Sequence, residues 1–145
     1  MGLDMYLRGD KYIARFDNSQ RDKDGNELEI KRPVIDGFEV ASYNLDLGYW
    51  RKFAPLHNYI VDVFANSVDD CQEIHLDSSD CHRIADALRN NGLPDNEDCH
   101  GFLFGSPELW DYYKDEAEEH AKVFDKAAAW IESNSWNSVT YQASW

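Results

Sequence analysis

The fold class is indicated most directly by the stretch SPELWDYYKDEAEEHAKVFDKAAAWIESNSWNSVTYQASW, residues 106–145. Over its first part apolar residues recur at helical spacing, and Ser106 followed by Pro107 is typical of a helix N-terminus. Over residues 139–145 apolar and polar residues alternate strictly, as in a strand with one buried face. We therefore expect a long helix over residues 106–133, followed by a strand.

Alternating strands are also expected at the other end of the chain. Residues 3–8 alternate between apolar and polar side chains, and Gly9-Asp10 follows as an expected turn. The alternation resumes over residues 11–17, which predicts a second strand. The polar stretch 18–27 then predicts a flexible hairpin loop.

The middle of the chain changes from strand to helical patterns. A third strand is expected over residues 28–35, at a sheet edge because Pro33 lacks a backbone donor, and a weaker fourth over 38–40. Apolar residues at helical spacing predict a helix over about 52–66. Pro55 fits only in the first turn of that helix, so the helix should begin close to residues 51–52.

A short strand over residues 73–77 and a second helix complete the set of elements. Asp77 or Ser78 can cap this helix, and Asn91-Gly92 is typical of its end. Its expected buried face consists of Cys81, Ile84, Ala85 and Leu88. The order of elements predicts a single α+β domain over residues 1–145, with a largely antiparallel sheet and three main helices packed on one face.

The charge of the chain is large, negative and unevenly distributed. Residues 1–52 hold nine Lys and Arg against ten Asp and Glu, whereas residues 53–145 hold five against eighteen, and the total is −14. Such a field repels nucleic acid and anionic membranes and attracts basic protein surfaces. The sequence contains no apolar run long enough to span a membrane and no signal peptide, and its three cysteines favour a reducing compartment. We expect a cytoplasmic protein that binds neither nucleic acid nor membrane directly.

Five acidic residues of the predicted long helix are candidates for the partner-binding surface. At helical spacing they line its outer face, and they are Asp111, Asp115, Glu118, Glu119 and Asp125. A charge run of this kind is most often only a solvated helix face. The sharper interpretation is a rigid array of carboxylates that imitates a phosphate backbone or binds a basic protein patch.

A small phosphorylated ligand is the alternative, and it involves a different set of residues. Arg51 and Lys52 are expected at a helix N-terminus, where backbone N–H groups also favour an anion. The turn Gly105-Ser106 precedes another helix and could add to such a site. The remaining candidates are Trp50 or Tyr43 for stacking on a base and His57 for hydrogen bonding or acid–base chemistry. Pairing of Arg51 and Lys52 with Asp4, Asp46 or other carboxylates of this acidic chain is the more common outcome for such cations.

No metal ion or other cofactor is expected. Cysteines and histidines are frequent in one stretch, at Cys71, His75, Cys81, His82, Cys99 and His100. Their spacing does not match the recurring close pairs of structural zinc sites. No catalytic motif is present either: a thiolate pair of Cys71 with His57 or His75 is disfavoured, because acidic surroundings raise the pKa of a thiol.

Five short landmarks give the chain a resemblance to a known group. They are MGLDMYL at 1–7, GYWRK at 48–52 with a histidine at 57, Asp70-Cys71, FLFGS at 102–106 and YQASW at 141–145. Together they resemble, over the whole chain, a widespread group of small proteins encoded by phages and prophages. The resemblance implies a viral or mobile-element origin and action in the bacterial cytosol, and it implies no particular reaction. Pro55, Cys81 and Cys99 depart from the pattern of that group, and the departure of the two cysteines further weakens a metal site that uses them.

Two hypotheses of function follow from these observations. The first is a non-enzymatic phage protein whose acidic face occupies a basic surface of a host or defence protein, in the manner of a nucleic-acid mimic. The second is a protein that binds or sequesters a nucleotide or phosphate, or an enzyme that acts on such a ligand. The two differ in geometry, because only the second needs the residues around Arg51 and Ser106 to share a concave site.

Overall fold

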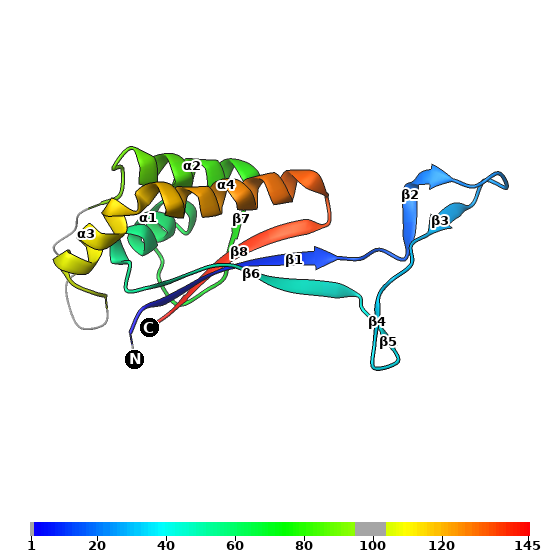
Figure 1. The fold of residues 1–145 in the computed structure, drawn as a ribbon, viewed down its shortest axis with the longest axis horizontal. Helices are drawn as coiled ribbons and strands as arrows, with labels where there is room; N and C mark the ends of the chain where they lie inside the picture. The colour runs from blue at the N-terminus through cyan, green and yellow to red at the C-terminus, as the bar shows by residue number, and fades with distance from the viewer. Residues whose placement is uncertain (1, 95–103) are drawn as a thin grey trace.

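The computed structural model describes residues 2–94 and 104–145. Within them, four strands form an antiparallel sheet in the order β6-β1-β8-β7, and four helices cover one of its faces (Figure 1). The strands of this sheet are β1 Asp4–Tyr12, β6 Ser42–Arg51, β7 Ile74–Leu76 and β8 Asn137–Ser144. The helices are α1 Ala54–Phe64, α2 Ser78–Arg89, α3 Pro107–Asp115 and α4 Ala117–Ser133. The predicted α+β class, with an antiparallel sheet and helices on one face, is confirmed.

The core lies between the sheet and the helices, where the apolar side of each strand faces α2 and α4. Met5 and Leu7 of β1 and Tyr141 of β8 are fully enclosed, while Asp4, Tyr6 and Arg8 of β1 lie on the opposite, open face. The buried face predicted for the second helix is confirmed, with Cys81, Ile84, Ala85 and Leu88 all buried in α2. The predicted strands at 73–77 and 139–145 are also confirmed, as β7 and β8.

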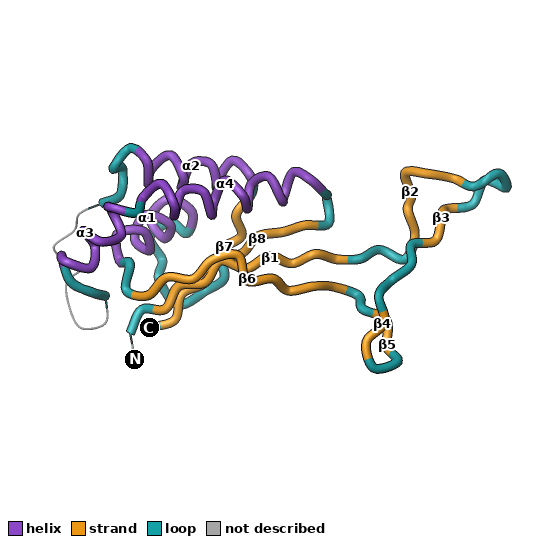
Figure 2. Tube along the Cα trace, in the orientation of Figure 1, coloured by secondary structure: helices purple, strands orange, loops and turns teal. Residues whose placement is uncertain are grey.

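An arm projects beyond the end of the sheet, between β1 and β6 (Figures 1 and 2). The arm comprises residues 13–41 and contains two hairpins, β2 Phe16–Arg21 with β3 Glu27–Glu29 and β4 Val34–Ile35 with β5 Phe38–Glu39. Arg32 fixes its base: the side chain is only 9 % exposed, and its Nε donates to the carbonyl oxygen of Ile13 at 2.9 Å.

The arm corrects the predictions for the N-terminal third. The stretch 18–27, expected to be a loop, is strand up to Arg21 and again from Glu27, so only a short turn joins β2 and β3. The single third strand predicted over 28–35 is wrong as well, because β3 and β4 are separate and belong to different hairpins. Neither hairpin joins the main sheet.

The turn predicted at Gly9-Asp10 is wrong, because β1 continues through both residues to Tyr12. Glycine is needed at position 9 because a side chain from α4 approaches the strand closely there. A Cβ atom at position 9 would lie 2.6 Å from Cζ3 of Trp130, so only glycine leaves room for that ring.

The longest strand of the sheet, β6, was not predicted. Its apolar residues alternate at odd positions from Tyr43 to Tyr49, but the residue that it buries is Trp50. A bulge opposite Leu7 and Arg8 adds a residue at Leu47 and changes which positions face the helices. This change hides the period-two pattern, and the edge position leaves most of β6 exposed.

The helix boundaries also differ from the predictions. The first helix begins at Ala54 instead of residues 51–52, because Arg51 is the last residue of β6 and Lys52 has a φ of 56°. The long helix predicted over 106–133 is two helices that meet at Glu116, whose φ of −104° and ψ of 21° interrupt the helical backbone. The interruption lets α3 take a direction of its own across the end of the sheet.

We expect Gly9→Ala to destabilise the fold, because the added methyl group must displace the indole of Trp130. The cost of such overpacking is about 2 kcal/mol, which for a chain of this length lowers the melting temperature by about 6 °C. Thermal unfolding followed by circular dichroism measures the shift. In Gly9→Ala/Trp130→Leu, where the ring is absent, the alanine should cost much less than in the wild-type background. An equal cost in both backgrounds would contradict the packing explanation.

Candidate functional site

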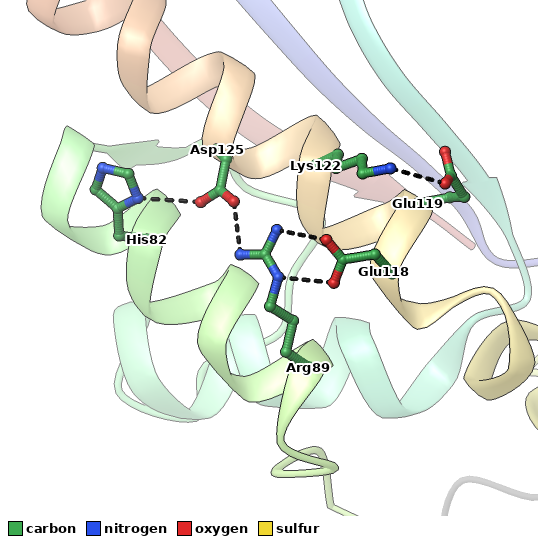
Figure 3. A network of polar contacts seen from close by, with 6 residues as sticks. All are labelled: His82, Arg89, Glu118, Glu119, Lys122 and Asp125. Atoms are coloured by element: carbon green, nitrogen blue, oxygen red, sulfur yellow. Dashed lines mark hydrogen bonds and ion pairs between the residues drawn. The ribbon is translucent and has the colours of Figure 1, made fainter.

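The acidic array predicted on one long helix is divided by ion pairs. Figure 3 shows Arg89 of α2 between two carboxylates of α4: its Nε lies 2.9 Å from Oε2 of Glu118, and its Nη1 lies 2.6 Å from Oδ2 of Asp125. Asp125 also contacts Nδ1 of His82 at 3.1 Å, and Glu119 lies 3.1 Å from Nζ of Lys122. Three of the five predicted residues are therefore paired with cations.

These contacts change the pKa values of the paired carboxyl groups. Hydrogen bonds from Arg89 are the main cause of the lowered pKa of Glu118. Burial acts to raise the pKa of Asp125, but hydrogen bonds from Arg89 and His82 outweigh it, and the pKa is lowered. Glu118 and Asp125 therefore stay ionised and connect α4 to α2, so the prediction that they belong to an open array with Asp111 and Asp115 is wrong.

The remaining acidic residues form a smaller exposed group on α3. We call Glu108, Asp111 and Asp115 the α3 ridge. The spacing of three and four residues places them on one side of the helix, all three are exposed, and within the described residues no cation lies within 4 Å of them. The exposed ring of Tyr112 lies on the same side. The pKa of Glu108 is lowered by hydrogen bonding to its own backbone and to Ser106.

Trp50 cannot serve as the stacking platform of the alternative ligand site. Its side chain is only 4 % exposed, its ring is stacked on Phe124 with centroids 5.3 Å apart, and its Nε1 donates to Nδ1 of His120 at 3.0 Å. Burial lowers the pKa of His120, which keeps the ring neutral and Nδ1 able to accept. The bulge in β6 turns this tryptophan into the core, so the predicted stacking role is wrong.

Tyr43 lies apart from the other ligand candidates. Tyr43 and Arg51 are at opposite ends of β6, eight residues and about 26 Å apart, so Tyr43 cannot share a ligand with Arg51. Arg51 was predicted at a helix N-terminus, and this is wrong, because it is the last residue of β6. Its exposed side chain lies 3.9 Å from Asp4. Lys52, expected beside it at the helix start, instead lies in the turn between β6 and α1.

Gly105 lies next to Lys52, and Ser106 directly follows it as the N-cap of α3. A Cβ atom at position 105, where φ is 109°, would lie 2.6 Å from the carbonyl oxygen of Lys52. Ser106 caps α3 by accepting from the backbone N–H of Leu109 at 3.4 Å. Glycine is thus needed for a close approach of two segments, and the serine for a cap, which accounts for both residues without a bound anion.

His57 is buried in a chain of polar contacts that the sequence did not reveal. The ring is 1 % exposed, with Nε2 2.9 Å from Oδ2 of Asp69 and Nδ1 2.7 Å from the hydroxyl of Tyr141. A carboxylate accepts, so Nε2 donates to Asp69, and in the neutral ring this leaves Nδ1 to accept from the hydroxyl. Burial, the main cause, raises the pKa of Tyr141, which therefore remains protonated. Oδ1 of Asp69 also accepts from Nε1 of Trp145 at 3.2 Å.

This chain of contacts joins several of the sequence landmarks. His57 follows GYWRK, Tyr141 and Trp145 begin and end YQASW, and Gln142 of that segment donates to the carbonyl oxygen of Cys71 at 3.0 Å. The ring of Phe104 lies 6.4 Å from that of Trp145. The predicted hydrogen-bonding role of His57 is therefore taken up inside the fold, between α1 and β8, and not by a ligand.

The cysteines and histidines are dispersed through the described residues. Cys81 lies in the core of α2, where burial raises the pKa of its thiol to about 12, and His82 turns outward to Asp125. In residues 2–94 and 104–145, no three His, Cys, Asp or Glu side chains are grouped as metal ligands would be. Cys99 and His100 lie outside the described residues.

Comparison of the chain with protein-family models, with curated protein sequences and with solved structures gives no match. Among the described helices, none is both long enough and apolar enough to cross a membrane.

We expect Arg89→Met to reduce stability in a pH-dependent way. Because the pKa values of Glu118 and Asp125 are lowered from 4.5 and 3.8, their ion pairs stabilise the fold fully above about pH 5 and are lost as the pH falls through the lowered values. The difference in melting temperature between wild type and variant should therefore shrink as the pH is lowered from 7 to about 3.

Arg83→Met on the same helix is the matched control, because Arg83 lies over the ring of Phe64 and forms no ion pair within the described residues. Its effect should not depend on pH in this range. A difference for Arg89→Met that is constant with pH would show that the arginine acts through packing alone.

We expect Tyr141→Phe to lower the free energy of unfolding by about 1–3 kcal/mol, because Nδ1 of His57 loses its donor inside the core. Urea denaturation measures the change. Tyr112→Phe, which removes a hydroxyl from a ring that is 55 % exposed, should change the free energy by less than about 0.5 kcal/mol. Equal small effects of both variants would show that the buried contact contributes nothing.

Proposed function

We propose that this protein is a non-enzymatic interaction protein, encoded by a phage, that binds a basic surface of a host or defence protein in the bacterial cytosol. In this role its acidic surface occupies the place of a nucleic acid and so inhibits or modulates the partner. The observation that carries the proposal is the α3 ridge, whose carboxylates are exposed and without cationic partners in the described residues.

The net charge gives the proposal its physical basis. At −14 the chain attracts basic surfaces over a distance of about a Debye length, close to 8 Å at physiological salt. Association with a basic partner is accelerated by such a field, and contact with nucleic acid itself is opposed. The phage origin and the cytosolic location rest on the resemblance of the sequence landmarks alone.

The α3 ridge places three negative charges in a row on one side of a helix. Its three carboxylates are spaced about 5 Å apart along the helix axis, comparable with the 3.4 Å rise between phosphates of one DNA strand. The exposed Tyr112 beside them adds an aromatic ring, and tyrosine is among the residues enriched in protein interfaces. Glu118 and Asp125 contribute less to this surface, because both are held in ion pairs with Arg89.

No second function is proposed from the ligand-binding residues. Trp50 and His57 are enclosed in the core, and Tyr43 lies at the far end of β6 from Arg51. In the described residues, therefore, Trp50, His57, Tyr43 and Arg51 are not brought together in one site.

The test of the proposal is competition with DNA. We expect the protein to displace labelled duplex DNA from at least one member of a panel of host DNA-binding proteins and defence nucleases. Displacement should weaken more than about tenfold between about 50 and 200 mM salt, because the complex is held by charge. The variant Glu108→Gln/Asp111→Asn/Asp115→Asn should lose the displacement.

The matched control carries the same three chemical changes on the arm: Asp24→Asn/Glu29→Gln/Asp36→Asn. Both variants have the same net charge, so the control should retain displacement if the α3 ridge is the surface used. Equal loss in both would show that only bulk charge matters. Absence of displacement by the wild-type protein across the panel would refute the proposal.

A further inference from the structure

We infer that the outer edge of β6 is a docking site for an extended segment of a partner protein, in which apolar and basic residues alternate. The segment would add to the sheet as a fifth strand. This site is separate from the α3 ridge, and it does not depend on the nucleic-acid mimicry proposed above.

The outer edge of β6 lacks a neighbouring strand. In the described sheet β6 pairs only with β1, and with ten residues it is the longest strand. An edge strand directs every second backbone N–H and C=O outward, and such a row pairs readily with another extended chain. Long exposed edges are usually protected in soluble proteins. In β6 the bulge at Leu47 interrupts the edge, but no described strand covers it.

Tyr113 shows how these outward groups are satisfied where a partner is present. Its hydroxyl accepts from the backbone N–H of Arg51 at 3.3 Å and donates to the carbonyl oxygen of Arg51 at 2.7 Å. Both groups of Arg51 therefore point away from β1. Among the described side chains only Tyr113 bonds the backbone of β6 in this way, so the edge from Ser42 to Tyr49 remains open.

The register of the sheet shows which residues direct their backbone groups outward. Arg51, Tyr49 and Asp46 pair with Asp4, Tyr6 and Arg8, the β1 residues of the open face. Because hydrogen-bonded and non-hydrogen-bonded pairs alternate along β1, Tyr49 and Asp46 share the outward orientation of Arg51. In an antiparallel fifth strand, the residues opposite them would place their side chains on the open face.

On the helix side, the edge of β6 is bordered by an apolar hollow of about 350 Å³. Most of its lining is apolar and comes from β6 and α4: Leu45, Leu47, Val123, Ala127 and Trp130. Lys126 also lines this hollow and disfavours a basic side chain there. Every second residue of an added strand would face this hollow, and an apolar side chain fits it.

On the open side, the same edge borders a second hollow of about 300 Å³ with a different character. Tyr6 and Tyr49 line it, with ring centroids 5.4 Å apart, together with Asp46. The exposed carboxylate of Asp46 is part of both hollows, and no cation lies within 4 Å of it in the described residues. The guanidinium of Arg8 already lies over the ring of Tyr6, 4.7 Å from its centroid. The ring of Tyr49 and the carboxylate of Asp46 are left to receive a Lys or Arg, which supplies the alternation of the inferred segment.

The charge also distinguishes the inferred partner from a second copy of this chain. Two β6 strands paired antiparallel would bring Asp46 of one copy near Asp46 of the other, between bodies that each carry −14. A basic segment instead gains from the same field. The edge therefore fits a cationic partner.

The test uses a labelled synthetic peptide of about ten residues in which valine and lysine alternate, a length that matches β6. Fluorescence anisotropy measures its binding. Two further peptides serve as controls: one with the same composition arranged in blocks, and one in which glutamate replaces lysine. We expect each control to bind at least about tenfold more weakly than the alternating peptide.

N-methylation tests whether the peptide pairs as an antiparallel strand. Opposite Tyr49 and Asp46, the N–H groups that point to β6 belong to the lysines. N-methylation of alternate lysines should abolish binding, whereas N-methylation of alternate valines should leave it within about threefold. Equal binding of both methylated peptides would overturn the inference.

Leu45→Lys tests the site on the protein, and Leu28→Lys in the arm is its control. The two leucines are 39 % and 37 % exposed, so both variants place a lysine at a similarly exposed strand position. We expect Leu45→Lys to weaken binding of the alternating peptide by about tenfold and Leu28→Lys by less than about twofold. Equal effects would overturn the inference.

Two further measurements separate this site from its rivals. The variant with three neutralised residues in the α3 ridge should bind the peptide nearly as wild type does, so this test can succeed where the competition with DNA fails. Sedimentation of the wild-type protein should show a monomer. A dimer that Leu45→Lys converts to a monomer would overturn the inference, because it would make a second copy the occupant of the edge.

Discussion

The fold depends on β1, which pairs with β6 on one side and with β8 on the other. This double pairing joins the beginning, the middle and the end of the chain in one sheet. All the described helices then pack on the same face, because the apolar residues of β1 and β8 point to that side only. In the part of the chain that the structure describes, no helix covers the other face and no strand pairs with the outer edge of β6. The open surfaces of this protein thus follow from the packing of its helices on a single face of the sheet.

The helical side of the core is held together by polar contacts as well as by apolar packing. Arg89 joins α2 to α4 through two carboxylates, and His57 joins α1 to Tyr141 of β8 and to Asp69. In these contacts, the carboxylates of Glu118, Asp125 and Asp69 are bound to side chains of the protein itself. As a result, the strongly negative composition is expressed as a few local groups, of which the α3 ridge is the most regular, and not as one continuous helix face.

Composition and periodicity were sufficient to predict the fold class, the buried face of α2 and the strands β7 and β8. The pattern failed where a local irregularity decided the structure. The bulge at Leu47 changed which residues of β6 face the helices and placed Trp50 in the core. At position 9, glycine is needed to make room for the ring of Trp130 and not to form a turn. The candidate site was predictable only in part: Asp111 and Asp115 are exposed as expected, but the cation partners of Glu118, Glu119 and Asp125 come from contacts in space.

By itself, the sequence determined the charge, the α+β class and the residues able to cap helices, because these depend on residue type and on short-range spacing. Only the tertiary structure decided which carboxylates remain free, which tryptophan is buried and which strand forms the open edge. Those outcomes depend on partners far apart in the chain, such as Arg89 with Glu118 and Arg51 with Tyr113. Short-range patterns carry no record of such pairs, since the free energy that fixes them arises only when the sheet and helices are packed.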